Sequence, residues 1–397
     1  MRIFSLSNLM AIFAAGAMLF PTLASAQAPA PGQQPLRRMD TAAPAPVIPE
    51  KDEFTNRLNG NTVTLVSGNP NGTYLSVAYD ISAVLDTGDE LRVLPVLGKG
   101  GGQNVKDVLY LRGIDMGITQ SNILRYFNES GEVGKNIEQR MRYIARLYNE
   151  EMHVLVRPEY NTIQDLRGKT VNFSDIGSGT QTTSQLIFKD LKIPVKEVNM
   201  GQADAFEALK KGEIDATILI AGKPTGAFAK LQPNPAYKLI PVAYTPELFE
   251  HYLPTKLTNE DYPNMIPKDQ PVETVAVSAV LAVFNWPSNS DRYRRVAKFT
   301  EAFFANFPKF LEKPRHPKWK EVNLAAELPG WTRFGAAQEI LEREKSLGND
   351  TQLKTAFEAF LANMPAGDGR PTTKARRDEL FAKFLEWHRS TQQRATR

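Results

Sequence analysis

Five segments of the chain combine glycine with serine, threonine, asparagine or glutamine, and each follows a strand-like run and precedes a helix-like one. They are residues 67–73, 98–104, 119–122, 174–183 and 221–226. A helix N-terminus presents unpaired backbone N–H groups and partial positive charge, which suit an anionic group. Glycine allows close backbone approach, and serine and threonine hydroxyls donate hydrogen bonds. One such loop is most often only a helix cap, but five of them indicate a binding site for a small anionic molecule.

The segments around these loops predict an α/β fold. Strand-like runs at 63–66, 91–97, 114–118, 170–173 and 214–220 alternate with helical spacing such as that of 74–85. Repeated strand–loop–helix units form parallel sheets, and ligands bind at the carboxyl ends of such strands. Two strand-like stretches within 141–156 and a long β-rich run at 272–284 follow, and 292–310 is predicted to be an amphipathic helix. A chain of this length suggests two domains.

Other kinds of site find little support in the sequence. Neither nucleotide-binding motif is present: there is no Gly-x-x-x-x-Gly-Lys-[Ser/Thr], and no Gly-x-Gly-x-x-Gly opens the first βα unit. Metal ligands are also lacking, since there is no cysteine and no two of the four histidines have metal-ligand spacing. His153 lies in an apolar run and is expected to be structural. The net charge of +4 comes from mixed signs and not from a basic face, so no nucleic-acid partner is expected. We therefore expect no cofactor, no metal and no enzymatic activity.

The N-terminal residues are typical of an exported protein. Arg2, the apolar run 9–20 and the small residues Ala24-Ser25-Ala26 predict a signal peptide over 1–26, cleaved after Ala26. Residues 27–54 are rich in alanine and proline and are expected to form a disordered lead. No cysteine follows the cleavage site, so we expect an unanchored protein in the periplasm.

At its glycine-rich loops the chain resembles the TAXI family of solute receptors, which serve TRAP transporters. The resemblance extends over about 63–310 and rests on segments 68–74, 100–104, 114–121, 166–171, 177–180, 212–216 and 221–225. It implies a type II periplasmic-binding-protein fold, with two Rossmann-like α/β lobes joined by a hinge near 153–156 and 272–284. The lobes would comprise 55–154 plus 276–348 and 155–275. The implied partners are a small carboxylate-bearing solute (an amino acid or organic acid) and the membrane subunits of a TRAP transporter.

The resemblance also implies a set of contact residues. By position they are Asn71, Gly72, Thr73, Tyr74, Gln120 and Ser121 in the first lobe, and Ser178, Gly179, Thr180, Gln181, Gly222, Lys223 and Thr225 in the second. Ser178, Gly179 and Thr180 would bind the anionic group, and the ring of Tyr74 would pack on the solute. Gln181 stands where many family members have arginine. Lys223, where histidine is common, could supply the missing charge or could be a solvated loop residue.

The C-terminal part departs from the family. Family members usually end near a His-Pro-Gly-Ala segment, whereas this chain has residues 328–337 there and continues into an extension. Apolar stripes at 353–364 and 380–387, separated by a turn at 365–371, predict a helical hairpin over 349–397. The role of this hairpin and the oligomeric state stay open.

Three alternatives to a TRAP receptor remain at this stage. The same lobes could serve an ABC importer or a sensor kinase, which gene neighbourhood would decide. An enzyme on the same fold is disfavoured by the lack of an acid–base constellation, although fold does not fix function. A structural or assembly role would depend on the C-terminal hairpin.

Overall fold

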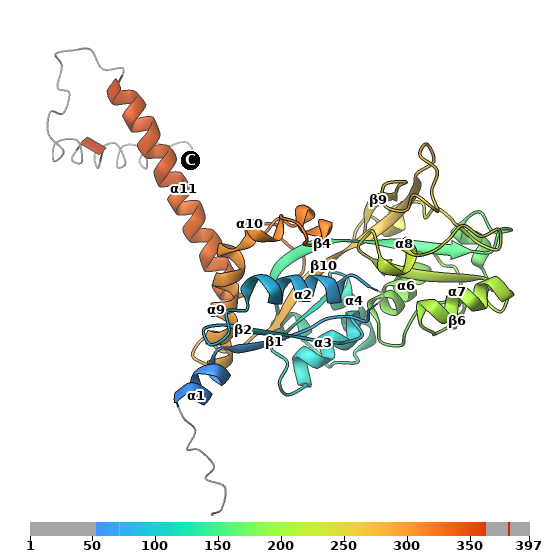
Figure 1. The fold of residues 1–397 in the computed structure, drawn as a ribbon, viewed down its shortest axis with the longest axis horizontal. Coiled ribbons are helices and arrows are strands. Elements are labelled where there is room, and N and C mark those ends of the chain that lie inside the picture. The colour runs from blue at the N-terminus through green and yellow to red at the C-terminus, as the bar shows by residue number, and fades with distance from the viewer. Residues whose placement is uncertain (1–52, 71, 363–379, 382–397) are drawn as a thin grey trace, which may run out of the picture. The chain divides into compact units, whose positions relative to one another are not determined.

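The computed structural model describes residues 53–70, 72–362 and 380–381. The described strands form one sheet in the order β2-β1-β3-β10-β4-β7-β5-β6, with β8 paired to β4 and β9 paired to β10. Helices cover the sheet (Figure 1). The signal peptide predicted over 1–26 and most of the lead predicted over 27–54 lie outside the described residues.

The strands have the following bounds: β1 (Thr62–Val66), β2 (Arg92–Val96), β3 (Met116–Gln120), β4 (Met141–Val156), β5 (Thr170–Asn172), β6 (Lys196–Val198), β7 (Ala216–Ala221), β8 (Lys238–Leu239), β9 (Leu253–Leu257) and β10 (Val272–Phe284). The helices are α1 (Glu53–Gly60), α2 (Tyr74–Leu85), α3 (Gly101–Tyr110), α4 (Ile123–Ser130), α5 (Ile137–Arg140), α6 (Gly179–Asp190), α7 (Gln202–Lys211), α8 (Gly226–Ala229), α9 (Asp291–Ala305), α10 (Phe307–Phe310) and α11 (Gly335–Ala362). Short 3-10 turns lie at η1 (Ile163–Leu166), η2 (Pro246–Leu248) and η3 (Pro317–Glu321).

Two α/β lobes share the long strands β4 and β10. In one lobe β1 is parallel to β2 and β3, and in the other β5 is parallel to β6 and β7. β10 is antiparallel to β3 and β4, and β4 is antiparallel to β7. The two parallel sets therefore run in opposite directions, so their carboxyl ends point toward each other. This is the two-lobed type II architecture, and the predicted fold class is confirmed.

The central strand β4 differs from its prediction. It is one strand of 16 residues instead of two short stretches, and its pairing with β10 is irregular at two places, of which one concerns the site. Ser278 of β10 pairs with Asn149, but Val280 pairs with Arg146, so β4 has one extra residue between these pairs. Such a bulge changes the face to which the following side chains point. Arg146 and Asn149 consequently both contact Ser278.

The apolar core lies on both faces of the sheet. Ala279 and Leu281 of β10 belong to one cluster of buried residues, and Val280 and Ala282 belong to another. Successive side chains of a strand point to opposite faces, so these clusters lie on opposite sides of the sheet. The helix predicted over 292–310 is observed as α9 and α10, and its apolar face packs into the first cluster around the fully buried Trp319.

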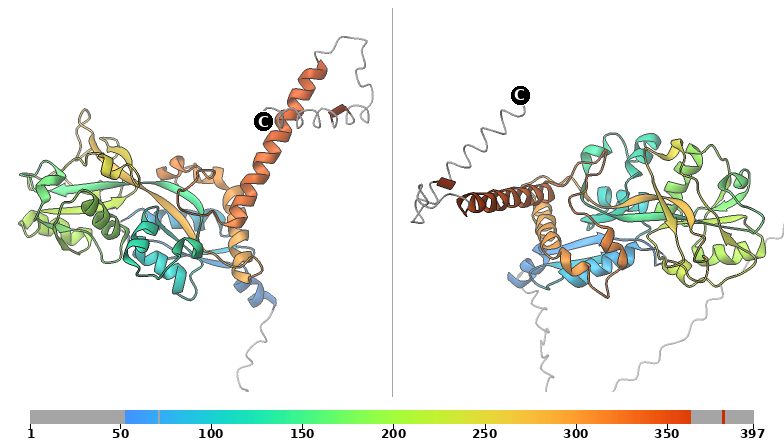
Figure 2. Two further views of the ribbon diagram at one scale, coloured as in Figure 1. Left: turned by 180° about the vertical axis from the view of Figure 1, so that it is seen from behind. Right: turned by 90° about the horizontal axis from the view of Figure 1, so that it is seen from above.

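The C-terminal helix α11 begins beside α9 and runs through residue 349 without interruption (Figure 2). Ala337 and Ile340 are buried in the core, whereas residues 342–346 are exposed. Further along, the ring of Phe357 contacts that of Phe381 at 5.1 Å between centroids. Residues 363–379 and 382–397 of the predicted hairpin lie outside the described residues.

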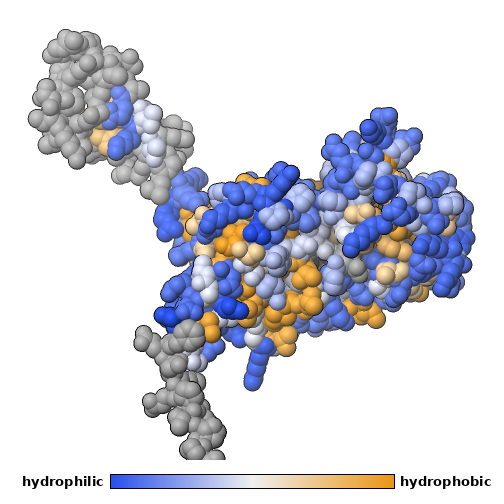
Figure 3. Space-filling model, viewed as in Figure 1, coloured by the Kyte–Doolittle hydropathy of each residue, from blue (hydrophilic) through white to orange (hydrophobic). Residues whose placement is uncertain are grey.

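The surface is mixed in character. Apolar residues gather over the lobe that carries α2 and α3, on the face that Figure 3 shows. Large apolar side chains that stay exposed in this lobe include Leu97 and Leu111. No helix within the described ranges is long and apolar enough to cross a membrane.

Candidate functional site

A small polar cavity lies where the carboxyl ends of β1, β3, β5 and β7 converge. Its volume is about 40 Å³, which is room for a few water molecules. The sequence-predicted residues that line it are Gly72, Thr73, Tyr74, Gln120, Ser178, Gly179 and Thr180. Residues of both lobes and of the shared strand β4 contribute to its wall. The structure thus brings most of the predicted contact residues together in one place.

The N-terminus of α6 forms one side of this cavity. Ser178 is the N-cap, and its hydroxyl oxygen accepts a hydrogen bond from the backbone N–H of Gln181 at 3.1 Å. The first N–H groups of an α-helix have no partner within the helix and carry the positive end of its dipole. Because Ser178, Gly179 and Thr180 line the cavity, this end of α6 suits a carboxylate.

Glu150 of β4 also lines the cavity, and the sequence reasoning missed it. Its side chain is buried, and the Tyr74 hydroxyl donates a hydrogen bond to Oε2 at 2.7 Å. Burial raises the pKa of Glu150 to about 8, against hydrogen bonds from Tyr74 and Gln120 that lower it. At neutral pH the carboxyl group is therefore mostly protonated. The signal available in the sequence was a pair of adjacent carboxylates, Glu150 and Glu151, inside a strand-like run.

Direct contacts join the two lobes around this cavity. The Thr73 hydroxyl donates to the carbonyl oxygen of Gly222 at 2.8 Å, and the backbone N–H of Gln103 donates to the carbonyl oxygen of Gly177 at 3.1 Å. The side-chain amide of Asn69 donates to Asp175 at 2.9 Å. The cavity is too small for an amino acid, which would fit only if the lobes parted.

Lys223 does not line this cavity. Its ammonium group contacts Asp261 at 2.9 Å and the carbonyl oxygen of Lys256 at 2.5 Å. Its backbone N–H donates to Glu151 at 2.9 Å. The charge that the sequence offered as a substitute for arginine is thus neutralised by a neighbouring carboxylate in this conformation.

The other predicted contact residues have different positions. The Gln181 side chain accepts from the backbone N–H of Gly177 and donates to Glu197. Thr225 caps α8, and its backbone N–H donates to the Tyr262 hydroxyl at 3.0 Å. Ser121 lines a separate, larger cavity. Asn71 lies outside the described residues.

His153 is structural, as its apolar surroundings predict. The side chain is fully buried, with Nδ1 2.9 Å from the carbonyl oxygen of Glu151 and Nε2 2.7 Å from the Tyr262 hydroxyl. Burial lowers its pKa to about 4, so the ring is neutral at neutral pH. In the part of the chain that the structure describes, no group of three or more His, Cys, Asp or Glu side chains could hold a metal ion.

Comparison with known proteins places the chain in a family. Several solved structures are distantly similar. One is a protein of Bordetella bronchiseptica RB50, with 16% identity over 80% of this chain and 93% of that chain and a TM-score of 0.42. Another is an L-arginine-bound amino acid ABC transporter substrate-binding protein from Streptococcus pneumoniae, with 16% identity over 66% and 96% and a TM-score of 0.40. The model of the NMT1-like family matches residues 65–330, which is more than half of the chain, and the chain therefore belongs to the NMT1-like family.

Proposed function

We propose that this protein is a periplasmic solute-binding protein. It captures a small carboxylate-bearing solute between its two lobes and delivers it to a TRAP-type membrane transporter. The observation that carries the proposal is the cavity between the lobes, which the capped N-terminus of α6 and the buried Glu150 both line. The thirteen sequence-predicted contacts are retained as the proposed ligand set, with Glu150 added.

The chemistry of the cavity favours an amino acid over a dicarboxylate. The N-terminus of α6 would hold the solute carboxylate through the backbone N–H groups at Gly179 and Thr180. The solute ammonium group would lie at Glu150, which would then lose its proton, because a nearby opposite charge stabilises the ionised carboxylate. A second solute carboxylate at Glu150 would gain at most a hydrogen bond from the protonated side chain and no ion pair.

Capture requires movement of the lobes. Small-molecule sites usually have several hundred Å³, whereas the cavity has about 40 Å³. β4 and β10 are the connections about which the lobes would part and close again, as in hinged binding proteins. A transporter could then distinguish the loaded, closed form by the surface that the two lobes present together.

Delivery to a TRAP transporter and export to the periplasm rest on the sequence. The order of the glycine-rich motifs over 63–310 supports the transporter class, and the apolar N-terminal run supports export. Once the solute is known, its uptake should be measured in cells that lack the TRAP membrane subunits. Loss of uptake supports this route, and unchanged uptake contradicts it.

The binding proposal is tested with pairs of solutes that differ only in the amino group. Native mass spectrometry of the protein purified from the periplasm should reveal a co-purified amino acid. In thermal-shift assays L-amino acids should stabilise the protein more than their des-amino counterparts, for example L-glutamate more than glutarate. Free ligand at about 100 times its Kd adds roughly 2.7 kcal/mol of stability.

Glu150→Gln should weaken amino-acid binding by about tenfold or more while affecting glutarate little, because only the ammonium contact is lost. Glu301→Gln, which changes an exposed carboxylate on α9, is the matched control. If no carboxylate stabilises the protein, the proposal fails. If Glu150→Gln lost equal affinity for glutamate and glutarate, only the proposed contact between Glu150 and the ammonium group would be refuted.

A further inference from the structure

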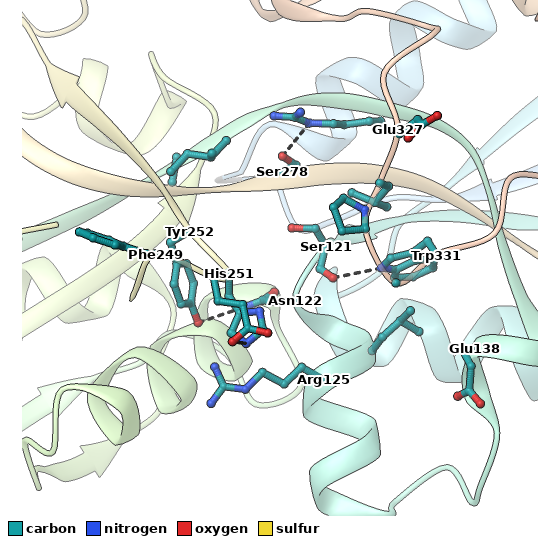
Figure 4. A pocket seen from close by; sticks show the side chains of 18 of the residues that line it. Ser121, Asn122, Arg125, Glu138, Phe249, His251, Tyr252, Ser278, Glu327 and Trp331 are labelled. Atoms are coloured by element: carbon teal, nitrogen blue, oxygen red, sulfur yellow. Dashed lines mark hydrogen bonds and ion pairs between the residues drawn. The ribbon is translucent and has the colours of Figure 1, made fainter. Parts of the chain in front are cut away.

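We propose that a second cavity, distinct from the first, binds a monocarboxylate with an apolar body and that Arg146 pairs with its carboxylate. This cavity has a volume of about 540 Å³, within the range of small-molecule sites. It shares no lining residue with the small cavity. Its wall comes from α4, β4, β10, residues 249–253 and residues 327–331 (Figure 4).

The two cavities lie on opposite faces of β4. Glu150 faces the small cavity with Tyr74, which belongs to the same buried cluster as Tyr148. The wall of the large cavity includes Leu124 and Trp331, which belong to the cluster on the other side of β10. The bulge in β4 permits this arrangement, because it turns Arg146 and Glu150 to different faces although they are four residues apart.

Arg146 is the feature that points to an anion. Its Nε donates to the Ser278 hydroxyl at 2.9 Å and its Nη2 to the Asn149 side chain at 3.3 Å. Among the described residues it forms no ion pair, whereas Arg125, also in the wall, is paired with Asp190 and Glu129. A guanidinium group has five N–H donors in a planar fork that matches a carboxylate. The hydrogen bonds to Ser278 and Asn149 orient the guanidinium group of Arg146 and leave its other N–H groups available to a ligand.

The walls favour an apolar body on the ligand. Their large apolar residues are Leu124, Phe249, Tyr252, Leu253, Leu328 and Trp331. The Trp331 ring is held by a hydrogen bond from Nε1 to the carbonyl oxygen of Ser121 at 3.1 Å, which Figure 4 also marks. A ligand with an aromatic or branched aliphatic group would bury that group against these side chains, which is favourable in proportion to the apolar area removed from water.

The rim selects against multiply charged anions. Glu138, Glu250 and Glu327 line the cavity; Glu138 is half-buried, and Glu250 and Glu327 are exposed. Their charges repel every negative charge on a ligand, and the single free guanidinium of Arg146 can offset this repulsion for one carboxylate only. With one uncompensated arginine and three carboxylates, the cavity suits a single carboxylate better than citrate or phosphate.

Phenylacetate is a suitable probe, and its binding to the full chain can be measured by isothermal titration calorimetry. Phenylacetate should bind, and neither phenylacetamide nor citrate should compete at equal concentration. Arg146→Met should weaken phenylacetate binding by about tenfold or more, because a charge-assisted pair is lost. Arg142→Met is the control. Arg142 lies on the same strand outside the cavity, and its guanidinium bonds only backbone carbonyls.

Two further variants keep the test decisive. Phe249→Glu changes a wall residue whose exposure is 54%, so folding should tolerate it, and it should abolish phenylacetate binding even if Arg146→Met fails to fold. Glu150→Gln should leave phenylacetate binding unchanged, which separates this site from the proposed amino-acid site. The inference is overturned if phenylacetate does not bind the folded protein, if Arg146→Met and Phe249→Glu bind it normally, or if Glu150→Gln loses it.

Discussion

Gly101 and Gly179 pack backbone against backbone where the two lobes meet. A Cβ atom at Gly101 would overlap the Cα atom of Gly179, and Gly101 has φ of +48°, a conformation that favours glycine. A Cβ atom at Gly179 would lie 2.8 Å from the end of the Gln120 side chain, which would have to move. This arrangement of the lobes therefore requires glycine at position 101.

The first prediction follows from this contact. Gly101→Ala should prevent full closure, because the clash is with backbone and cannot be relieved by a rotamer change. We expect a larger radius of gyration in small-angle X-ray scattering and a stability loss of about 1–3 kcal/mol, which is typical of a strained backbone position. Gly113→Ala is the control, since Gly113 also has positive φ but open space around it. Equal effects of the two variants would show that strain alone is responsible.

Glu150 should make stability depend on pH. Its pKa in the folded protein is about 8, against an ordinary value of 4.5, so the folded state holds the proton more tightly than the unfolded state. The contribution of Glu150 to the free energy of unfolding is complete below pH 4.5, falls as the pH rises, and is lost above about pH 8. Each unit of pKa difference corresponds to about 1.4 kcal/mol.

Urea unfolding between pH 6.5 and 8 measures this dependence. This pH window avoids the titration of His153. Because the pKa of His153 is lowered to about 4, its effect makes stability rise with pH between 4 and 6.5, opposite to the effect of Glu150. Glu150→Gln should show a flatter pH dependence than the native protein in this window. An unchanged slope would mean that Glu150 does not keep its proton in the folded state.

Thr73→Val should loosen the contact between the lobes. The buried Thr73 hydroxyl donates to the Gly222 carbonyl, and valine has a similar shape but no donor, so the carbonyl loses its partner. We expect a loss of about 1–3 kcal/mol and a shift toward the open form in scattering. Thr62→Val removes a hydrogen bond to Leu58 within one lobe and should change stability without changing the radius of gyration. Identical scattering of both variants would contradict the prediction.

The pair of Arg125 and Asp190 should stabilise the contact between α4 and α6. Nη1 and Nη2 of Arg125 donate to the two carboxylate oxygens at 2.7 and 2.5 Å, and both side chains are largely buried. Lysine cannot reproduce this two-point contact, so Arg125→Lys should cost about 1 kcal/mol. A double-mutant cycle with Asp190→Asn measures the coupling. The same cycle on the more exposed pair of Arg157 and Glu159 should give a smaller coupling free energy.

Several features followed from the sequence alone. The alternation of strand-like runs, glycine-rich loops and helical spacing predicted the α/β fold and the loops that meet at the carboxyl ends of the strands, because these depend on local patterns. Ser178 as a helix cap and His153 as a buried structural residue were predictable for the same reason. The position of the small cavity followed from the topology of parallel strands.

The tertiary structure decided which charges face which cavity. Asp261, which neutralises Lys223, is 38 residues away in the sequence, and Tyr74, which bonds Glu150, is 76 residues away. The bulge that turns Arg146 away from Glu150 depends on the pairing of β4 with β10. The large cavity gave no sequence signal, because its wall comes from segments that meet only in the folded chain. Local pattern therefore determined the elements of this protein, whereas long-range pairing determined the environment of its charged side chains.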